Sequence, residues 1–304
     1  MQSEEKRISS DIQKRIQYHL YHTWGDSIDS TQKDRFMSNF SDENKIVGYV
    51  LLDMLLFHNQ SQEKQLIKSL LRKLYSSIYK EAEVSLDIDS GDIHSFLEKE
   101  MKMACFIPVL DKNPADSSNA WTSIIREQVG GSDSFYEAER IPLLVAIRKK
   151  FFVFYDDMLG TGNQFETFLT KKRYDVNEKK AYSILDIVEA NDIKVYYLCI
   201  AGCSKGIGNI EEKYPRIKVI VSERFEECDS VLSKDNEYWA YYSKDFRNYI
   251  IGKIEHILED EEIEEPFSKN IAVMFERNRP SNTVFPLYWY NKKQWKPLKS
   301  REER

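Results

Sequence analysis

Cysteine and histidine are scarce in this sequence, and their scarcity excludes several kinds of site. The 304 residues include four cysteines and five histidines. The cysteines, Cys105, Cys199, Cys203 and Cys228, lack the paired spacing of a zinc site. No histidine lies in the most distinctive motif, which disfavours catalysis by a Ser–His or Cys–His pair. We therefore expect buried, reduced thiols rather than a metal centre or a disulfide framework.

A long apolar run and a positive net charge are also missing. Residues 46–57 (IVGYVLLDMLLF) come closest to a membrane helix, but they are too few and include Asp53, so we expect a buried helix and no membrane span. The start, MQSEEKRISSDIQKR, has no secretory signal pattern, which favours a cytoplasmic location. The net charge of −6 argues against a general nucleic-acid coat and leaves room for a local basic patch.

The first part of the chain has the spacing of amphipathic helices. Apolar residues recur at intervals of three and four over residues 12–22, 43–59 and 63–80. No strand pattern occurs before residue 103, and residues 83–92 are rich in turn formers. We predict a helical N-terminal region over residues 1–85, resembling a winged-helix unit.

From residue 103 onward, strand and helix patterns alternate. This order is typical of a mostly parallel sheet covered by helices on both faces. The pattern predicts an α/β domain over residues 86–304. The predicted strands are 103–110, 151–155, 192–202, 217–223 and 270–276, and the predicted helices are 121–130, one starting near Asn163, 178–190 and 234–257.

The stretch FFVFYDDMLGTGNQF, residues 151–165, is the most informative motif. Its aromatic start predicts a buried strand, after which Asp156 and Asp157 emerge at the carboxyl end, where open α/β sheets bind ligands. The glycines allow a backbone to approach an anion, and a helix N-terminus follows. Two carboxylates next to such a loop suit the diol and phosphate of a ribose 5-phosphate, or a divalent cation bound through water.

This motif resembles the phosphoribosyl pyrophosphate motif of type I phosphoribosyltransferases. The resemblance implies that Asp156 and Asp157 contact the ribose hydroxyls, stabilise charge at the anomeric carbon, and help to hold Mg²⁺ with the ligand diphosphate. It implies that the 5-phosphate is bound by the loop made of Gly160, Thr161, Gly162, Asn163 and Gln164. Gln164 stands where the family usually has Thr or Ser, and Gly160 also departs from the usual residue.

Two further loops are candidates for the same site. Residues 111–121 (DKNPADSSNAW) take the place of the family's pyrophosphate loop, which makes Lys112 a candidate ligand. Residues 201–210 (AGCSKGIGNI) follow a later strand, and Ser204 and Lys205 there could meet a base or a pyrophosphate, or the stretch could simply turn the chain. A nicotinamide site is disfavoured, because such a glycine loop should follow the first strand of its domain.

The end of the chain narrows the resemblance. The stretch PSNTVFPLYWYNKKQWKPLKSR, residues 280–301, is similar to the ending of a phosphoribosyltransferase-like branch found in prokaryotic conflict systems. That branch implies a role in anti-phage defence with a partner protein, for example a retron reverse transcriptase. The Trp-rich tail is also basic, so it could bind nucleic acid, although a solvated tail is the more frequent explanation.

These observations are compatible with three classes of function: an enzyme, a sensor and a structural subunit. The favoured interpretation is chemistry at the anomeric carbon of a phosphoribosyl or nucleotide ligand, with Mg²⁺. The alternatives are a non-catalytic nucleotide sensor that acts through a partner protein, and a structural subunit that binds nucleic acid.

Overall fold

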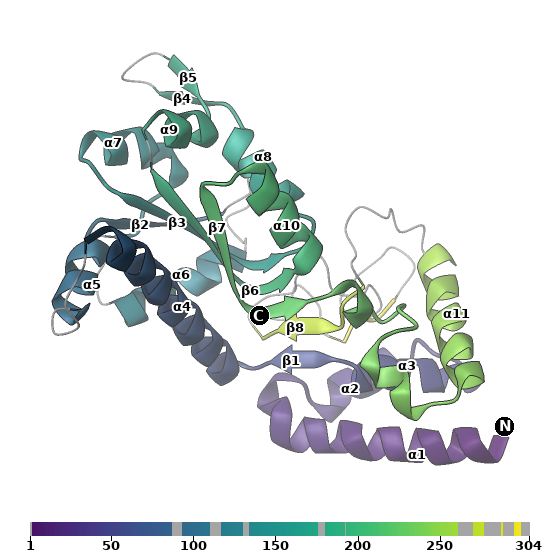
Figure 1. Cartoon of the computed structure of the whole chain (residues 1–304). Helices are drawn as coiled ribbons and strands as arrows, with labels where there is room; N and C mark the ends of the chain where they lie inside the picture. Colours follow the sequence, from purple (N-terminus) through teal and green to yellow (C-terminus); the bar gives the residue numbers. More distant parts are fainter. Residues whose placement is uncertain are drawn as a thin grey trace. The chain divides into compact units, whose positions relative to one another are not determined.

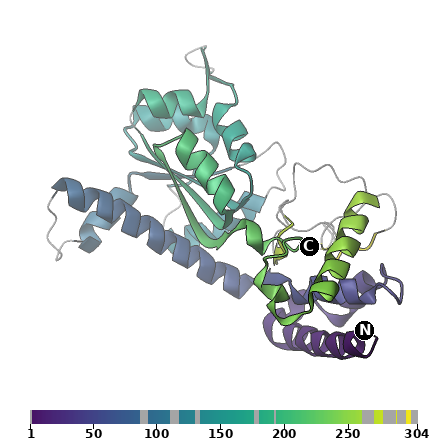
Figure 2. The same ribbon diagram turned by 45° about the vertical axis from the view of Figure 1, so that its right-hand side comes forward.

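The chain forms two compact units in a computed structural model. One, here called the sheet unit, is Lys64–Arg224; the other, called the helical unit, joins Met1–Glu63 to Phe225–Arg304. The structure describes residues 2–86, 93–109, 117–129, 134–175, 180–191, 193–260, 270–276, 287 and 295–298. Figures 1 and 2 show each unit from two directions.

A four-stranded sheet is the centre of the sheet unit. Its strand order is β2-β3-β6-β7, formed by β2 (Ala104–Pro108), β3 (Phe151–Leu159), β6 (Lys194–Cys203) and β7 (Ile217–Phe225). β2 and β6 both pair with β3 in parallel. The predicted α/β fold with a parallel sheet is confirmed. β2, β3 and β6 are buried along almost their whole length, as expected for strands covered on both faces.

Helices cover both faces of this sheet (Figure 1). α4 (Gln60–Leu86) and α6 (Ser117–Val129) pack on one face, where Leu71, Trp121 and Leu198 border one small hollow. The other face forms an apolar core with α7 (Ile141–Ala146), α8 (Asn163–Thr170), α9 (Ile184–Ala190) and α10 (Ser204–Lys213). In that core Phe165 stacks on Tyr197 with ring centroids 3.7 Å apart. A short helix, α5 (Ile93–Met101), precedes β2.

The helical unit brings together both ends of the chain. It contains α1 (Gln2–Tyr18), α2 (Ser30–Met37), α3 (Lys45–Asp53) and α11 (Lys244–Asp260), with one apolar core shared between them. The apolar run 46–57 was predicted as a buried helix, and its first part forms α3, whose Val47, Val50 and Leu51 are fully buried. Its last two residues belong to a strand instead. Within the described ranges, no helix is long and apolar enough to cross a bilayer.

Three local predictions were wrong. A strand does precede residue 103: β1 (Leu56–His58) pairs in parallel with β8 (Val273–Phe275). The predicted helix 178–190 begins as a strand instead, because β5 (Lys180–Tyr182) pairs with β4 (Arg173–Asp175) before Ser183 caps α9. The predicted helix 234–257 includes a separate 3₁₀ segment, Glu237–Tyr241, before α11 begins at Lys244.

The compact units differ from the predicted boundary between residues 85 and 86. α4 runs through that boundary, and its Ile67, Leu70 and Leu71 are buried in the sheet unit. β1 requires β8 from the far end of the chain, so the N-terminal helices and the C-terminal segments fold together. The helical unit is therefore made of two separate parts of the sequence, because β1 pairs with a strand that is distant along the chain.

Part of the Trp-rich tail packs within the helical unit. Trp295 meets Phe40 edge to face, with ring centroids 5.6 Å apart. Asn39 exchanges two hydrogen bonds with the backbone of Lys296, and Arg35 donates to the Leu298 carbonyl at 3.3 Å. The tail was expected to belong to the α/β domain and instead contacts α2 and the turn after it. Most of its other basic residues lie outside the described residues.

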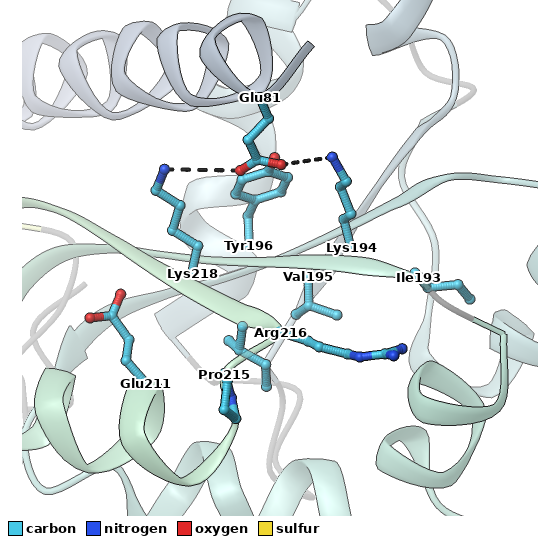
Figure 3. Close-up of a pocket in the computed structure, with 10 residues that line it drawn as sticks. Glu81, Ile193, Lys194, Val195, Tyr196, Glu211, Pro215, Arg216 and Lys218 are labelled. Atoms are coloured by element: carbon cyan, nitrogen blue, oxygen red, sulfur yellow. Dashed lines mark hydrogen bonds and ion pairs between the residues drawn. The ribbon is translucent and has the colours of Figure 1, made fainter. Parts of the chain in front are cut away.

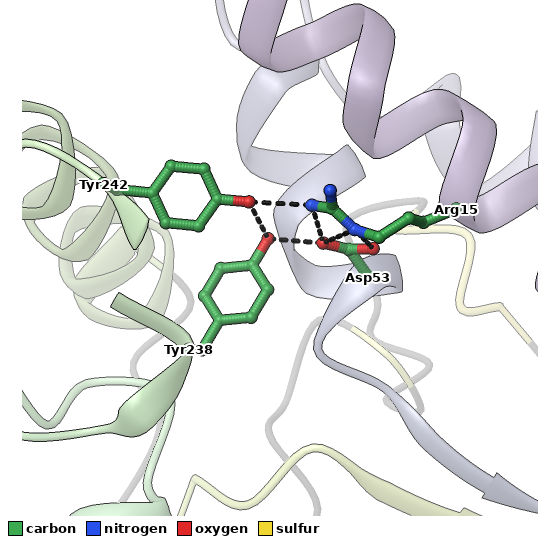
Figure 4. A network of polar contacts seen from close by, with 4 residues as sticks. All are labelled: Arg15, Asp53, Tyr238 and Tyr242. Atoms are coloured by element: carbon green, nitrogen blue, oxygen red, sulfur yellow. Dashed lines mark hydrogen bonds and ion pairs between the residues drawn. The ribbon is translucent and has the colours of Figure 1, made fainter. Parts of the chain in front are cut away.

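A buried carboxylate ties several segments of the helical unit together (Figure 4). The side chain of Asp53 is 2% exposed and accepts three hydrogen bonds from Arg15: Nε to Oδ1 at 2.9 Å, Nε to Oδ2 at 3.2 Å and Nη2 to Oδ2 at 2.6 Å. The Tyr238 hydroxyl donates to the same carboxylate at 2.7 Å, and Arg15 also donates to Tyr242 at 2.7 Å. Asp53 raises the pKa of Arg15 above its usual value through this hydrogen bond. The network joins α1, α3 and the segment before α11.

We predict that Arg15→Ala lowers the free energy of unfolding by about 1–3 kcal/mol, because it leaves the Asp53 carboxylate buried without its cation. The side chain of Arg15 is 47% exposed, which keeps the cost below that of a fully buried pair. Lys14→Ala is the matched control, since its bond to Asp11 lies in solvent and should contribute under about 0.5 kcal/mol. Equal losses for both variants in urea unfolding would contradict this account.

Candidate functional site

β3 extends beyond its neighbour at the carboxyl end of the sheet. Pairing of β2 with β3 ends at Pro108 opposite Tyr155, whereas β3 remains paired with β6 as far as Leu159 opposite Gly202. Val109 donates to the Tyr155 carbonyl at 3.0 Å, and it is the last described residue before a gap in the description. The last part of β3 therefore has β6 on one side and no pairing with β2 on the other. Ligands of open α/β sheets bind in such a place.

Asp156 and Asp157 lie in this overhanging part of β3. They were expected to emerge beyond the strand, yet they belong to it and are only 5% and 7% exposed. Each carboxylate accepts a hydrogen bond from the next backbone amide. The N–H of Asp157 donates to Asp156 Oδ1 at 2.9 Å, and the N–H of Met158 donates to Asp157 Oδ1 at 2.7 Å. These bonds fix both carboxylates in place.

Asp156 lies on the face of the sheet that α8 covers, because alternate side chains along a strand share a face. Phe154 belongs to the core beneath α8, so Asp156 lies on that face. Gln164 of α8 accordingly reaches Asp156, with Nε2 3.5 Å from Oδ2. Asp157 also lies near the same buried pair, because it adds to the charge felt by Tyr197 and Cys199. A ligand at this end of β3 would lie close to both carboxylates.

The residues beneath Asp156 stay neutral. Burial raises the pKa of Cys199 well above its usual value, and the negative charge of Asp156 raises it further. Burial likewise raises the pKa of Tyr197, with Cys199 and Asp156 adding to the effect. A thiol in this environment is a poor nucleophile. The site therefore presents carboxylate oxygens next to uncharged side chains, and it contains no thiolate at Cys199.

A tight loop joins β3 to α8. Gly162 has a φ of +93°, a conformation that favours glycine, and it precedes the first residue of the helix. Thr161 Oγ1 accepts from the Asn163 amide at 3.4 Å. Gly160 and Gly162 are buried, whereas Asn163 and Gln164 are exposed. The predicted phosphate loop is thus a turn that ends at a helix N-terminus, with Gln164 directed toward Asp156.

The second glycine stretch is a helix start and not a turn. β6 continues to Cys203, and α10 begins directly at Ser204, so Ser204 and Lys205 occupy its first turn. Gly206 packs against the backbone of the loop after β3: a Cβ there would lie 2.0 Å from the Gly160 oxygen. Asn209 donates to the Thr161 carbonyl at 3.2 Å. The stretch therefore packs on the loop after β3, and Gly206 serves that packing.

Gly206 and Asn209 are contributions that the sequence reasoning missed. The spacing Gly202-x-x-x-Gly206 was the available signal, since small residues permit close packing. Lys112 lies outside the described residues, and so does most of the predicted pyrophosphate loop.

An open hollow of about 410 Å³ adjoins the outer side of the loop. Thr161, Asn163 and Asn209 border it, together with Glu166 and Lys213, which form an ion pair. Asp156 and Asp157 do not line this hollow. The loop is thus accessible from outside, and the carboxylates lie on its inner side.

No group of three or more His, Cys, Asp or Glu side chains that could hold a metal occurs among the described residues. Two adjacent carboxylates still offer the hard oxygen donors that Mg²⁺ prefers. Mg²⁺ usually keeps water and substrate oxygens as ligands, so the donor set suits a cation shared with a bound diphosphate.

We predict that Gly206→Ala destabilises the chain by about 1–3 kcal/mol, because its Cβ would overlap the Gly160 carbonyl and displace the loop. Gly208→Ala is the matched control two residues later in α10, where a Cβ meets nothing within 4 Å. The control should raise helix stability by up to about 1 kcal/mol. Chemical unfolding measures both, and a stable Gly206→Ala variant would contradict the close approach.

Comparisons with known proteins identify the family of this chain. A model of the PRTase-CE family matches residues 33–301. Similar solved structures include the AQ2163 protein from Aquifex aeolicus, with 16% identity, a TM-score of 0.27 and coverage of 41% of this chain and 56% of that one. Another is orotate phosphoribosyltransferase from Aeropyrum pernix, with 11% identity, a TM-score of 0.25 and coverage of 44% and 73%. No curated protein matches. Since the family model spans most of its length, the chain belongs to the PRTase-CE family.

Proposed function

We propose that the chain binds a ribose 5-phosphate ligand, such as phosphoribosyl pyrophosphate or a nucleotide, at the overhanging end of β3. The observation that carries the proposal is the sequence of groups along one edge: Asp156 and Asp157, then the turn at Gly162, then the start of α8. A ribose across the open edge would place a hydroxyl near each carboxylate. Its 5-phosphate would meet the amides of residues 160–164.

The loop supports anion binding through its backbone. The first amides of a helix lack partners within the helix, and the helix dipole favours a negative charge at that end. Gly160 and Gly162 have no side chain that would block approach, and Thr161 adds a hydroxyl. Gln164 already contacts Asp156 at 3.5 Å, so one side chain links the phosphate end of the site to its diol end.

The carboxylates support chemistry at the anomeric carbon. Loss of a leaving group from that carbon develops positive charge on the sugar ring, and fixed carboxylates stabilise such charge. Asp156 and Asp157 are held by backbone amides, so little reorganisation is needed. Bound Mg²⁺ would neutralise the diphosphate and help it to leave, and these two residues would hold the cation through ligand oxygens and water.

We further propose that the chain acts as an effector of an anti-phage defence system together with a partner protein. The similarity of the tail, residues 280–301, to a conflict-system branch supports this role. Trp295 and Lys296 anchor part of that tail on the helical unit. Copurification with the product of a neighbouring gene, a retron reverse transcriptase for example, tests the role. A chain that protects cells from phage without any partner would contradict it.

The site is tested with Asp157→Asn and Asp156→Asn. We expect each to weaken phosphoribosyl pyrophosphate binding in the presence of Mg²⁺ by about 10-fold or more, since a hydrogen bond to a charged group contributes about 1.5–3 kcal/mol. Glu189→Gln on α9 is the control, because that residue is exposed and away from the motif. Calorimetry gives the affinity. Unchanged binding in both Asp variants would contradict the proposal that these carboxylates contact the ligand.

The same samples separate an enzyme from a sensor. Release of pyrophosphate, or of a base from a nucleotide, by the natural chain and not by the Asp variants supports catalysis. Tight binding without turnover supports the alternative of a non-catalytic nucleotide sensor.

A further inference from the structure

A second hollow lies at the end of the sheet opposite to Asp156 and Asp157. It has a volume of about 460 Å³, within the range of small-molecule sites, and the amino-terminal ends of β6 and β7 form it together with α4. All of its lining belongs to the sheet unit. Charged residues dominate that lining: Glu81, Lys194, Glu211, Arg216 and Lys218.

The charged side of the hollow is arranged around one carboxylate (Figure 3). Glu81 of α4 lies between two lysines, with Lys194 Nζ 2.8 Å and Lys218 Nζ 3.9 Å from its oxygens. Both lysine side chains are about half exposed, so these ion pairs are open to water and contribute little stability. The second acid, Glu211, is engaged elsewhere, because it accepts the Val219 amide at 3.0 Å. An anion of higher charge could therefore compete with Glu81 for the lysines.

A buried hydroxyl lies at the same point. Tyr196 is 1% exposed, and Figure 3 shows its ring between the two lysines, beside Glu81. Its hydroxyl has no hydrogen-bond partner of ordinary geometry among the described residues. Burial raises the pKa of Tyr196, and the charge of Glu81 raises it further, so the hydroxyl keeps its proton. The Glu81 carboxylate contacts this buried donor, and a ligand oxygen that replaced it with ordinary geometry would satisfy the hydroxyl.

The other side of the hollow is apolar. Ile193, Val195, Pro215 and Ile217 contribute to its lining. Figure 3 shows Val195 and Pro215 on the side of the strands away from Glu81. Ile193, Val195 and Ile217 are buried in the core, so Pro215 is the exposed apolar residue of this lining. The hollow thus combines two cations and a hydroxyl donor with the exposed ring of Pro215. Inorganic phosphate would use only the first part.

We propose that this hollow is a second ligand site, which takes a phosphate monoester with an apolar body. The phosphate displaces the Glu81 carboxylate from Lys194 and Lys218 and accepts a hydrogen bond from Tyr196, and the body extends over the ends of the strands to Pro215. The site is independent of the proposed ribose-phosphate site, because the two use opposite ends of the sheet.

Phenyl phosphate is the probe, titrated into the full chain by calorimetry. It carries a phosphate and an apolar ring but lacks the ribose hydroxyls expected at Asp156 and Asp157. We expect Lys194→Gln and Lys218→Gln each to weaken binding by about tenfold through loss of a charge-assisted contact. Glu81→Gln should tighten binding several-fold, because it removes the competing carboxylate. Lys172→Gln is the matched control, since that lysine pairs with Asp186 elsewhere on the same unit and should change nothing.

The opposite signs expected for the lysine and Glu81 variants make the test specific, and circular dichroism verifies that each variant folds. Absence of phenyl phosphate binding at millimolar concentration would overturn the proposal. So would a loss of affinity that follows Asp156→Asn instead of Lys194→Gln, which would place the probe in the ribose-phosphate site. Inorganic phosphate that binds as tightly as phenyl phosphate would also contradict it, by showing that the apolar side takes no part.

Discussion

The geometry of the candidate site depends on the close approach of two backbones, at Gly160 and Gly206. The start of α10 rests directly on the loop after β3, with no room for a side chain between them. This contact, with the Asn209 bond to Thr161, holds the turn that ends at Gly162. Because the turn is held, the first amides of α8 and the carboxylates at the end of β3 keep a constant relation. A site for an anion and a diol needs such preorganisation.

The sequence predicted those helices and strands whose pattern is visible within one short segment, and it missed those that depend on distant pairing. The buried strand at 151–155 and the α/β alternation were predicted, because apolar runs and helical periodicity are visible within one segment. β1 was missed, since its three residues form a strand only through pairing with β8, more than two hundred positions away. The interleaved units have the same cause, and no local pattern encodes them.

The sequence singled out the residues of the candidate site without indicating their environment. Asp156, Asp157 and the loop to Gln164 were identified from their order along the chain. Their burial was not, because it depends on the extension of β3 along β6. The glycines around Ser204 suggested a turn, since glycine disfavours helices. Packing against Gly160 overrides that preference and makes Gly206 part of a helix.

The central claim is that the backbone amides after β3 hold the phosphate of a ribose 5-phosphate ligand. Hydrogen–deuterium exchange tests this most directly, by comparing the chain alone with the chain saturated by phosphoribosyl pyrophosphate and Mg²⁺. The account predicts slower exchange in peptides that cover residues 160–164, with little change at the opposite end of the sheet. Ligand binding that leaves exchange in residues 160–164 unchanged would contradict it.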